Sequence, residues 1–356
     1  MRVLNDPLAL ARPEIRALAA YEHAAWEPGC ERLHANELPW RATTDRSTAG
    51  LNRYPEPHPD TLAATLADLY GTTPAQLLPC RGSDEAIDLL VRAFCAAGRD
   101  AVIVCPPTFG MYSVAARIQG AAVAAVPLLK DAGFALDVAG IGARCAGGDV
   151  KLIFLCSPNN PTGQLLETAQ VEQVLRAAAD RALVVIDEAY LEFAAAASAA
   201  QRIARQPHVV VLRTLSKAHG LAGARIGALI ADARIVGLLR KVVPPYAIAQ
   251  PCIEAALHAL AKPQRRVAGE RVAAIVRERR RLAAALARLP CVARVWPSAA
   301  NFLLVEFVNA AQALARLRHS QLLVRDFRDR PGLERALRIT VGTPQANDRL
   351  IGSLAC

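Results

Sequence analysis

The 356-residue sequence lacks several features that would place it in a familiar class of protein. Although 53% of its residues are hydrophobic, no apolar run reaches the roughly 18 residues of a membrane-spanning helix, so we expect no contact with a membrane. Polar residues and two prolines interrupt the first 16 positions and leave no room for the apolar stretch of a signal peptide. We therefore expect a protein of the cytoplasm.

Paired cysteines are also missing. The nine cysteines occur singly, with no CxxC pair and no histidines at the spacing of a zinc site, so we expect no metal and interpret the cysteines as small buried residues of a reducing compartment. No GxGxxG follows an expected strand, which argues against dinucleotide binding.

The net charge of +10 is concentrated in the C-terminal part of the chain. Residues 262–356 contain 18 Lys and Arg against 7 Asp and Glu. Around Arg277–Arg281 the arginines fall mostly on the polar face of a helical pattern, which indicates a solvated surface. Because no helix-turn-helix, zinc finger or basic segment with interleaved aromatic residues occurs, we expect no nucleic-acid partner.

From residue 101 to 230, short β-branched runs alternate with segments of helical periodicity. This alternation predicts an α/β protein with a central, mostly parallel sheet flanked by helices. After Lys241, Pro244 and Pro245 break the chain, and arginine-rich helices lead to two further strands, so we expect a smaller second domain there. The expected strands are 101–105, 151–156, 183–186, 209–212, 226–230, 301–307 and 338–341, and helices are expected at 87–94 and 171–178.

Polar residues follow four of the expected strands. Ligands bind beyond the carboxyl ends of the strands of an open parallel sheet, so these segments should converge on one site. They are Pro106–Tyr112, Ser157–Gly163, Asp187–Tyr190 and Arg213–Lys217.

Lys217 is the most informative of these residues. It is one of only five lysines in a chain that otherwise uses arginine. A lysine that is partly desolvated beside other cations can lose its proton and form an imine with an aldehyde, whereas arginine cannot. Alone, Lys217 would be interpreted as a surface residue. The polar residues that follow the other strands favour a functional role instead.

Asp187 closes an apolar strand, where a buried carboxylate needs a cationic partner such as a protonated pyridine nitrogen. The alternative is a helix cap or a loop aspartate. Tyr190 and Asn160 can both reach a ring hydroxyl, although turn chemistry alone could explain Asn160.

Two segments could bind a phosphate. The turn Arg81–Glu85 opens a helix whose N–H groups and dipole favour an anion, unless Asp84 and Glu85 themselves complement the dipole. The other candidate brackets Lys217 with Thr214, Ser216 and Arg225.

These motifs together resemble the fold-type-I aminotransferases, which are three-layer enzymes that use pyridoxal 5'-phosphate. The resemblance rests on Gly82–Glu85, Asn160–Gly163, Asp187–Tyr190 and Ser216-Lys217 with Arg225. Further stretches narrow it to the histidinol-phosphate aminotransferases, namely Asn36–Pro39, Tyr54–Pro57, Pro106–Tyr112, Val324–Asp326 and Leu337–Gly342.

The resemblance implies a role for each matching residue. Lys217 would carry the cofactor as a Schiff base, Asp187 would bind the pyridine nitrogen, and Tyr112 would stack on the ring. Tyr190 and Asn160 would reach the ring oxygen. The cofactor phosphate would be bound by Ser83, Asp84, Thr214, Ser216 and Arg225.

The resemblance also implies a homodimer with shared active sites, in which Tyr54 reaches the neighbouring subunit's cofactor. Arg325 and Arg338 would bind the substrate anions, while Tyr21 and Asn36 would close the pocket. The implied division is an N-terminal arm at 1–40 that packs with the small domain, a large cofactor-binding domain at 41–245 and a small domain at 246–356.

The implied reaction is the exchange of an amino group between L-glutamate or 2-oxoglutarate and histidinol phosphate or imidazole acetol phosphate, a step of histidine biosynthesis. An aromatic amino-acid aminotransferase and a threonine-phosphate decarboxylase remain alternatives with the same cofactor, and a non-catalytic cofactor-binding module is a third. The sequence departs from the family at Ser83, where alanine is common, at His219, where an aromatic residue is common, and after Tyr21, where some relatives have an arginine.

Overall fold

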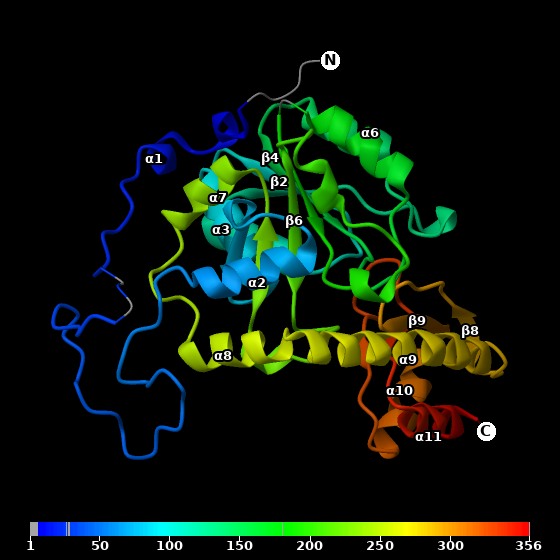
Figure 1. Cartoon of the computed structure of the whole chain (residues 1–356). Helices are drawn as coiled ribbons and strands as arrows, with labels where there is room; N and C mark the ends of the chain where they lie inside the picture. Colours follow the sequence, from blue (N-terminus) through cyan, green and yellow to red (C-terminus); the bar gives the residue numbers. More distant parts are fainter. Residues whose placement is uncertain (1–5, 26, 28, 180, 356) are drawn as a thin grey trace.

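The computed structural model describes residues 6–355 apart from 26, 28 and 180, and these residues form two sheets flanked by helices (Figure 1). The large sheet has the order β1-β7-β6-β5-β4-β2-β3, and the small sheet has the order β10-β11-β9-β8. The strands are β1 (Leu77–Cys80), β2 (Ala101–Val104), β3 (Ala122–Ala125), β4 (Val150–Cys156), β5 (Leu183–Asp187), β6 (Val209–Thr214), β7 (Gly227–Ile230), β8 (Val292–Val295), β9 (Phe302–Phe307), β10 (Arg325–Asp326) and β11 (Ala336–Thr340).

The expected mostly parallel sheet is confirmed. The adjacent strands β6, β5, β4, β2 and β3 are all parallel to one another. β7 instead runs antiparallel to β6, and β1 runs antiparallel to β7. The connection from β6 to β7 contains only the short 3-10 turn η6 (Ala222–Ala224), whereas a parallel crossover usually needs a helix.

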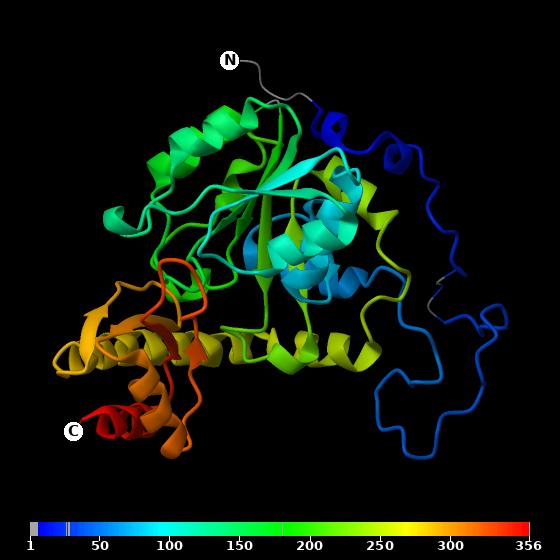
Figure 2. The same cartoon turned by 180° about the vertical axis from the view of Figure 1, so that it is seen from behind.

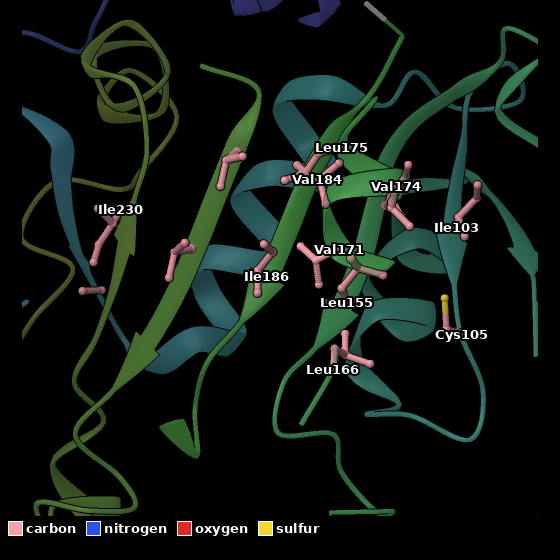
Figure 3. Packing of buried hydrophobic residues seen from close by; sticks show 14 of the residues in the cluster. Ile103, Cys105, Leu155, Leu166, Val171, Val174, Leu175, Val184, Ile186 and Ile230 are labelled. Atoms are coloured by element: carbon pink, nitrogen blue, oxygen red, sulfur yellow. The ribbon is translucent and has the colours of Figure 1, made fainter. Parts of the chain in front are cut away.

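Helices cover both faces of the large sheet. One face packs against α2 (Asp60–Tyr70), α5 (Val138–Cys145), α6 (Thr168–Ala178) and α8 (Gln250–Ala259), and the other against α3 (Gly82–Phe94), α4 (Met111–Gln119) and α7 (Ala233–Arg240). Residues of β5 alternate between the two faces, because successive side chains of a strand point in opposite directions. Figure 3 shows the first face, where Val171, Val174 and Leu175 of α6 lie against Val184 and Leu155 of the sheet.

The small sheet is antiparallel and also packs on both faces. Its outer face contacts α9 (Lys262–Leu286), α10 (Ala310–His319) and α11 (Pro344–Leu354). On its inner face, Trp296, Leu304 and Ala336 join the core of the large sheet. Helix α8 also packs in that core through Ile253 and Ala256, although the expected domain limit at residue 246 precedes it.

The N-terminal segment begins on the large domain, where η1 (Pro7–Leu10) and α1 (Pro13–Arg16) lie beside α3 and α7 (Figure 1). Between residues 17 and 57 the described chain then runs away from the body as an extended loop, which we call the arm (Figures 1 and 2). Large apolar side chains are exposed along it, namely Leu18, Tyr21, Leu33, Leu38, Trp40, Leu51 and Tyr54. Within the described residues, no helix is both long and apolar enough to cross a membrane.

Four further 3-10 turns connect these elements. They are η2 (Pro74–Gln76), η3 (Lys130–Ala132), η4 (Leu191–Phe193) and η5 (Ala199–Arg202).

Candidate active site

The strand ends predicted to converge do meet around one cavity. Its volume is about 140 Å³, and it lies beyond the carboxyl ends of β4, β5 and β6. Its lining residues are Ser83, Asp84, Phe109, Cys156, Asn160, Asp187, Ala189, Tyr190, Thr214, Ser216, Lys217, Ala222 and Arg225.

Asp187 is a buried carboxylate at the end of β5. Its Oδ2 accepts a hydrogen bond from the Tyr112 hydroxyl at 2.7 Å, and its Oδ1 accepts one from the Ala189 N–H at 3.0 Å. Burial raises the pKa of Asp187 and these two hydrogen bonds partly oppose that shift. None of the described residues forms an ion pair with Asp187, so a cation bound in the cavity would stabilise its charged form.

Lys217 follows β6 and reaches the same cavity, with its Nζ 5.7 Å from the centroid of the Tyr190 ring. Its pKa is lowered, first by burial and then by the positive charges of Arg338 and Arg225. A larger fraction of Lys217 is therefore neutral than for an ordinary lysine at the same pH, and the neutral amine is the nucleophile.

The N-terminus of α3 forms one wall of the cavity and can bind an anion. The N-cap residue Arg81 makes no side-chain cap, so it leaves the first amides of the helix available. Glu85 is turned away from the cavity, since its carboxylate accepts from the N–H and the Nε of Arg81, both at 2.7 Å. Glu85 therefore complements the N-cap amide of α3, while the amides of Ser83 and Asp84 remain available.

Gly227 of β7 allows the N-terminus of α3 to lie close to the sheet. A Cβ atom at Gly227 would lie 2.6 Å from the carbonyl carbon of Gly82 and 2.8 Å from the nitrogen of Ser83. Only glycine permits this approach of helix to strand.

Hydroxyl groups and a guanidinium complete the anion site. The Thr214 hydroxyl donates to the Ser216 Oγ at 3.0 Å, and Arg225 Nη1 donates to the same oxygen at 3.3 Å. Arg225 Nη2 also pairs with the Asp84 carboxylate at 3.2 Å, which partly neutralises it. Backbone amides, two hydroxyls and a guanidinium suit a phosphate group.

The structure does not support the predicted stacking role of Tyr112. Its side chain is fully buried, its ring stacks on Phe154 at 4.7 Å, and it does not line the cavity. The reason is that Tyr112 lies in the first turn of α4, on the same buried face as Ala115 and Ala116. Phe109, which precedes the helix, lines the cavity instead.

Arg338 of the small domain meets the large domain at this site. Its Nη1 donates to the Asn160 Oδ1, and its guanidinium lies 5.1 Å from the centroid of the Phe302 ring. Its Nε is buried and has no partner among the described residues. Arg325 of β10 lies opposite Arg338 of β11 in the strand register, so two positive charges lie close together near the cavity.

Three predicted site residues, Tyr21, Asn36 and Tyr54, are not brought to the cavity. All three are exposed on the arm, and none lines the cavity of its own chain. Tyr54 stacks instead on Tyr246, with ring centroids 4.6 Å apart.

The ion pairs behind the site were not predicted from the sequence. Arg213 is buried and donates to Glu188 at 3.0 Å and to Glu192 at 2.7 Å. An arginine in an apolar strand could have indicated such a partner. No cluster of three or more potential metal ligands occurs among the residues that the structure describes.

Over nearly its whole length the chain is similar to known enzymes. Residues 34–354 match the family described as Aminotransferase class I and II. A histidinol-phosphate aminotransferase of Xylella fastidiosa (strain 9a5c) is 50% identical over 350 residues, which are 98% of this chain and 96% of that relative.

Two solved structures share the fold. The histidinol-phosphate aminotransferase from Sinorhizobium meliloti, in complex with pyridoxal-5'-phosphate, is 27% identical with a TM-score of 0.75, and the match covers 85% of this chain and 82% of that chain. An L-threonine-O-3-phosphate decarboxylase from Porphyromonas gingivalis is also 27% identical, with a TM-score of 0.70 and coverage of 85% and 90%.

Proposed function

The chain belongs to the family of class I and II aminotransferases, and from this premise we propose that it transfers an amino group between L-glutamate and histidinol phosphate with pyridoxal phosphate bound at Lys217. One observation carries the proposal: Lys217, Asp187 and the anion site at Arg225 line a single cavity. The 50% identity to a histidinol-phosphate aminotransferase supports the choice of substrate.

The residues present fit the cofactor. Asp187 has no ion-pair partner among the described residues and would receive a protonated pyridine nitrogen, while Ser83, Thr214, Ser216 and Arg225 would bind the phosphate. Asp84 would contribute its backbone N–H. When bound, pyridoxal phosphate supplies an aldehyde for the amine and a ring that accepts electrons from the substrate Cα.

Lys217 performs two tasks in this proposal. Its neutral amine would hold the cofactor through the aldehyde. Once freed by the substrate, the Nζ would act as the general base that takes the proton from the substrate Cα and then as the acid that returns it. The positive charges of Arg338 and Arg225 favour the neutral form needed for both tasks.

Tyr190 and Asn160 orient the ring, and Arg338 binds the substrate carboxylate. Because the Arg338 guanidinium is held against Asn160 and has an unpartnered Nε within the described structure, it can accept a carboxylate without leaving the site. Arg325, exposed beside it, is available to the phosphate of histidinol phosphate.

We further propose a homodimer in which the arm of one subunit packs on the other. The exposed apolar residues of the arm need a partner surface, and a second copy would bring Tyr54, with Tyr21 and Asn36, to the neighbouring cavity. Mixing Tyr54→Ala and Lys217→Ala proteins under conditions of subunit exchange should restore about one quarter of the wild-type activity, since random exchange leaves one intact site in half of the dimers. Activity no greater than the sum of the separate variants would contradict shared sites. The expected cytoplasmic location remains a prediction.

The function is tested by loading the protein with pyridoxal phosphate, reducing it with borohydride and mapping the labelled peptide. Lys217 should carry the label, and histidinol phosphate should convert the bound cofactor at the lowest concentration among candidate amino donors. A labelled lysine elsewhere, or phenylalanine reacting at lower concentration than histidinol phosphate, would refute the corresponding part of the proposal.

Threonine-phosphate decarboxylase remains a second candidate because one solved structure of that activity shares the fold over 85% of the chain. Release of carbon dioxide from threonine phosphate, without transfer of the amino group, would support it instead.

A further inference from the structure

Lys130 of the large domain forms an ion pair with the small domain. Lys130 lies in η3, and its Nζ is 2.8 Å from the Glu306 Oε1 of β9 and donates to the Gly332 carbonyl at 2.7 Å. Glu306 is only 7% exposed, and its Oε1 also accepts from Trp296 Nε1 at 3.2 Å. The Lys130–Glu306 pair is therefore a partly buried link between the domains.

Glu306 and Arg338 occupy the same face of the small sheet. In the register of β9 and β11, Glu306 lies opposite Ala336 and Leu304 lies opposite Arg338. Paired residues of an antiparallel sheet share a face, and so do residues two apart in a strand. Leu304 and Ala336 belong to the core beneath the large sheet, which places this face toward the large domain.

The large-domain side of the contact is also one connected block. Phe134, four residues after Lys130, packs on Trp296 at 4.6 Å, and its carbonyl accepts from Gln164. Gln164 belongs to the turn that contains Asn160, because its carbonyl accepts from the Asn159 N–H at 2.8 Å. The same turn meets the small domain a second time, where the Ala299 N–H donates to the Gly163 carbonyl at 2.7 Å.

We propose that Lys130 and Glu306 are positioning residues that set where Arg338 stands relative to Asn160. The inference rests on the function proposed above, in which Arg338 binds the substrate carboxylate. Neither residue lines the cavity, so each acts through the β9–β11 ladder and the Asn160 turn. A displacement of about 1 Å at a positioned group can cost about 100-fold in rate, so a small movement of the sheet would be measurable.

The proposal predicts a defect in substrate binding rather than in cofactor binding. Lys130→Met should raise the KM for glutamate and 2-oxoglutarate about tenfold and change kcat less than about threefold, because carboxylate binding is weakened in ground state and transition state alike. The absorbance and affinity of the bound cofactor should stay as in the wild type. Lys130→Arg, which keeps the charge and the donors, should restore most of the affinity.

Glu306→Gln provides the second variant. The amide keeps an acceptor for Trp296 and Lys130 but removes the charge, so the protein should fold and show a smaller rise in KM in the same direction. Faster hydrogen exchange at residues 302–307 in the cofactor-free variants would report the loosened sheet independently of activity. Arg144→Met is the matched control, because it removes an ion pair of the large domain, with Asp149 at 2.6 Å, that does not contact the small domain.

Two results would overturn the proposal: a KM within about twofold of the wild type in both Lys130→Met and Glu306→Gln, or a Lys130→Arg variant as impaired as Lys130→Met. Failure of the proposed function is a separate result, since the wild-type protein itself would then show no transamination.

Discussion

Replacing Gly227 by alanine tests how closely α3 must approach the sheet for the anion site to exist. The φ of Gly227 is not in the left-handed region, so its backbone conformation permits alanine. The obstacle is space: the new Cβ would lie 2.6 Å from Gly82 C, 2.8 Å from Ser83 N and 2.9 Å from Arg213 O. All three are backbone atoms, so no side chain can rotate away and the helix or the strand must shift.

The size of the effect follows from these distances. Ordinary contacts between carbon atoms are about 3.5–4.0 Å, so the start of α3 must move by about 1 Å. Forcing an extra methyl group into a packed site costs about 1–3 kcal/mol, and we expect about 2–3 kcal/mol because three backbone contacts are affected. The same shift would draw the amides of Ser83 and Asp84 away from a phosphate bound at the proposed anion site. A charge-assisted hydrogen bond contributes about 1.5–3 kcal/mol, so cofactor affinity should fall about 10- to 100-fold.

Thermal unfolding and cofactor titration of Gly227→Ala measure both consequences. Gly269→Ala is the control, since a Cβ there meets nothing within 4 Å and the residue lies inside α9. An alanine in a helix interior is about 0.5–1 kcal/mol more favourable than glycine, so the control should raise the melting temperature while Gly227→Ala lowers it. A Gly227→Ala protein as stable as the wild type, with unchanged cofactor affinity, would refute the packing argument.

Three further outcomes follow from the site. Asp187→Asn should still bind the cofactor but lose at least about 100-fold in turnover, because the pyridine nitrogen is no longer kept protonated; near-normal turnover would exclude this role for Asp187. The rate at which the cofactor-free protein captures pyridoxal phosphate should increase as the pH rises through the lowered pKa of Lys217, since only the neutral amine reacts. Arg338→Met removes a nearby cation and so raises that pKa, and the plot of capture rate against pH should therefore move to higher pH. An unchanged plot would contradict the electrostatic effect of Arg338. If Phe109 packs against the cofactor ring, Phe109→Ala should weaken cofactor binding by about 0.5–1.5 kcal/mol in a spectroscopic titration, whereas an unchanged affinity would exclude this role for Phe109.

The central strands of the large sheet were predictable, because strands buried on both faces consist of continuous runs of β-branched and other apolar residues. Those predicted at 151–156 and 183–186 are observed at Val150–Cys156 and Leu183–Asp187. The two edge strands of this sheet, β1 and β3, were not predicted from the sequence. β1 contains Pro79, and three of the four residues of β3 (Ala122–Ala125) are alanine. Neither proline nor alanine favours a strand, so these segments are strands because of the neighbours with which they pair.

The site was predictable to the extent that it consists of strand ends. Lys217, Asp187 and Asn160 follow or end strands, and the topology alone brings them together. The buried position of Tyr112 was harder to predict because it depends on where α4 begins, and only the helical spacing of Tyr112, Ala115 and Ala116 indicates a buried face. Within the single chain Tyr54 stacks on Tyr246, and its proposed role at a neighbouring cavity requires a second subunit, which one chain does not contain.

Adjacent residues at the ends of β5 and β6 serve opposite faces of the sheet. Asp187 and Thr214 line the cavity on the side of α3. Their neighbours Glu188 and Arg213 point to the other side, where they pair at 3.0 Å and the guanidinium lies 4.6 Å from the Tyr70 ring of α2. Removing one partner of a buried pair costs about 3–5 kcal/mol, so this pair holds the two strand ends together firmly. The Asp187 carboxylate and the Thr214 hydroxyl, which line the cavity, therefore keep their separation because of an ion pair whose two residues do not line it.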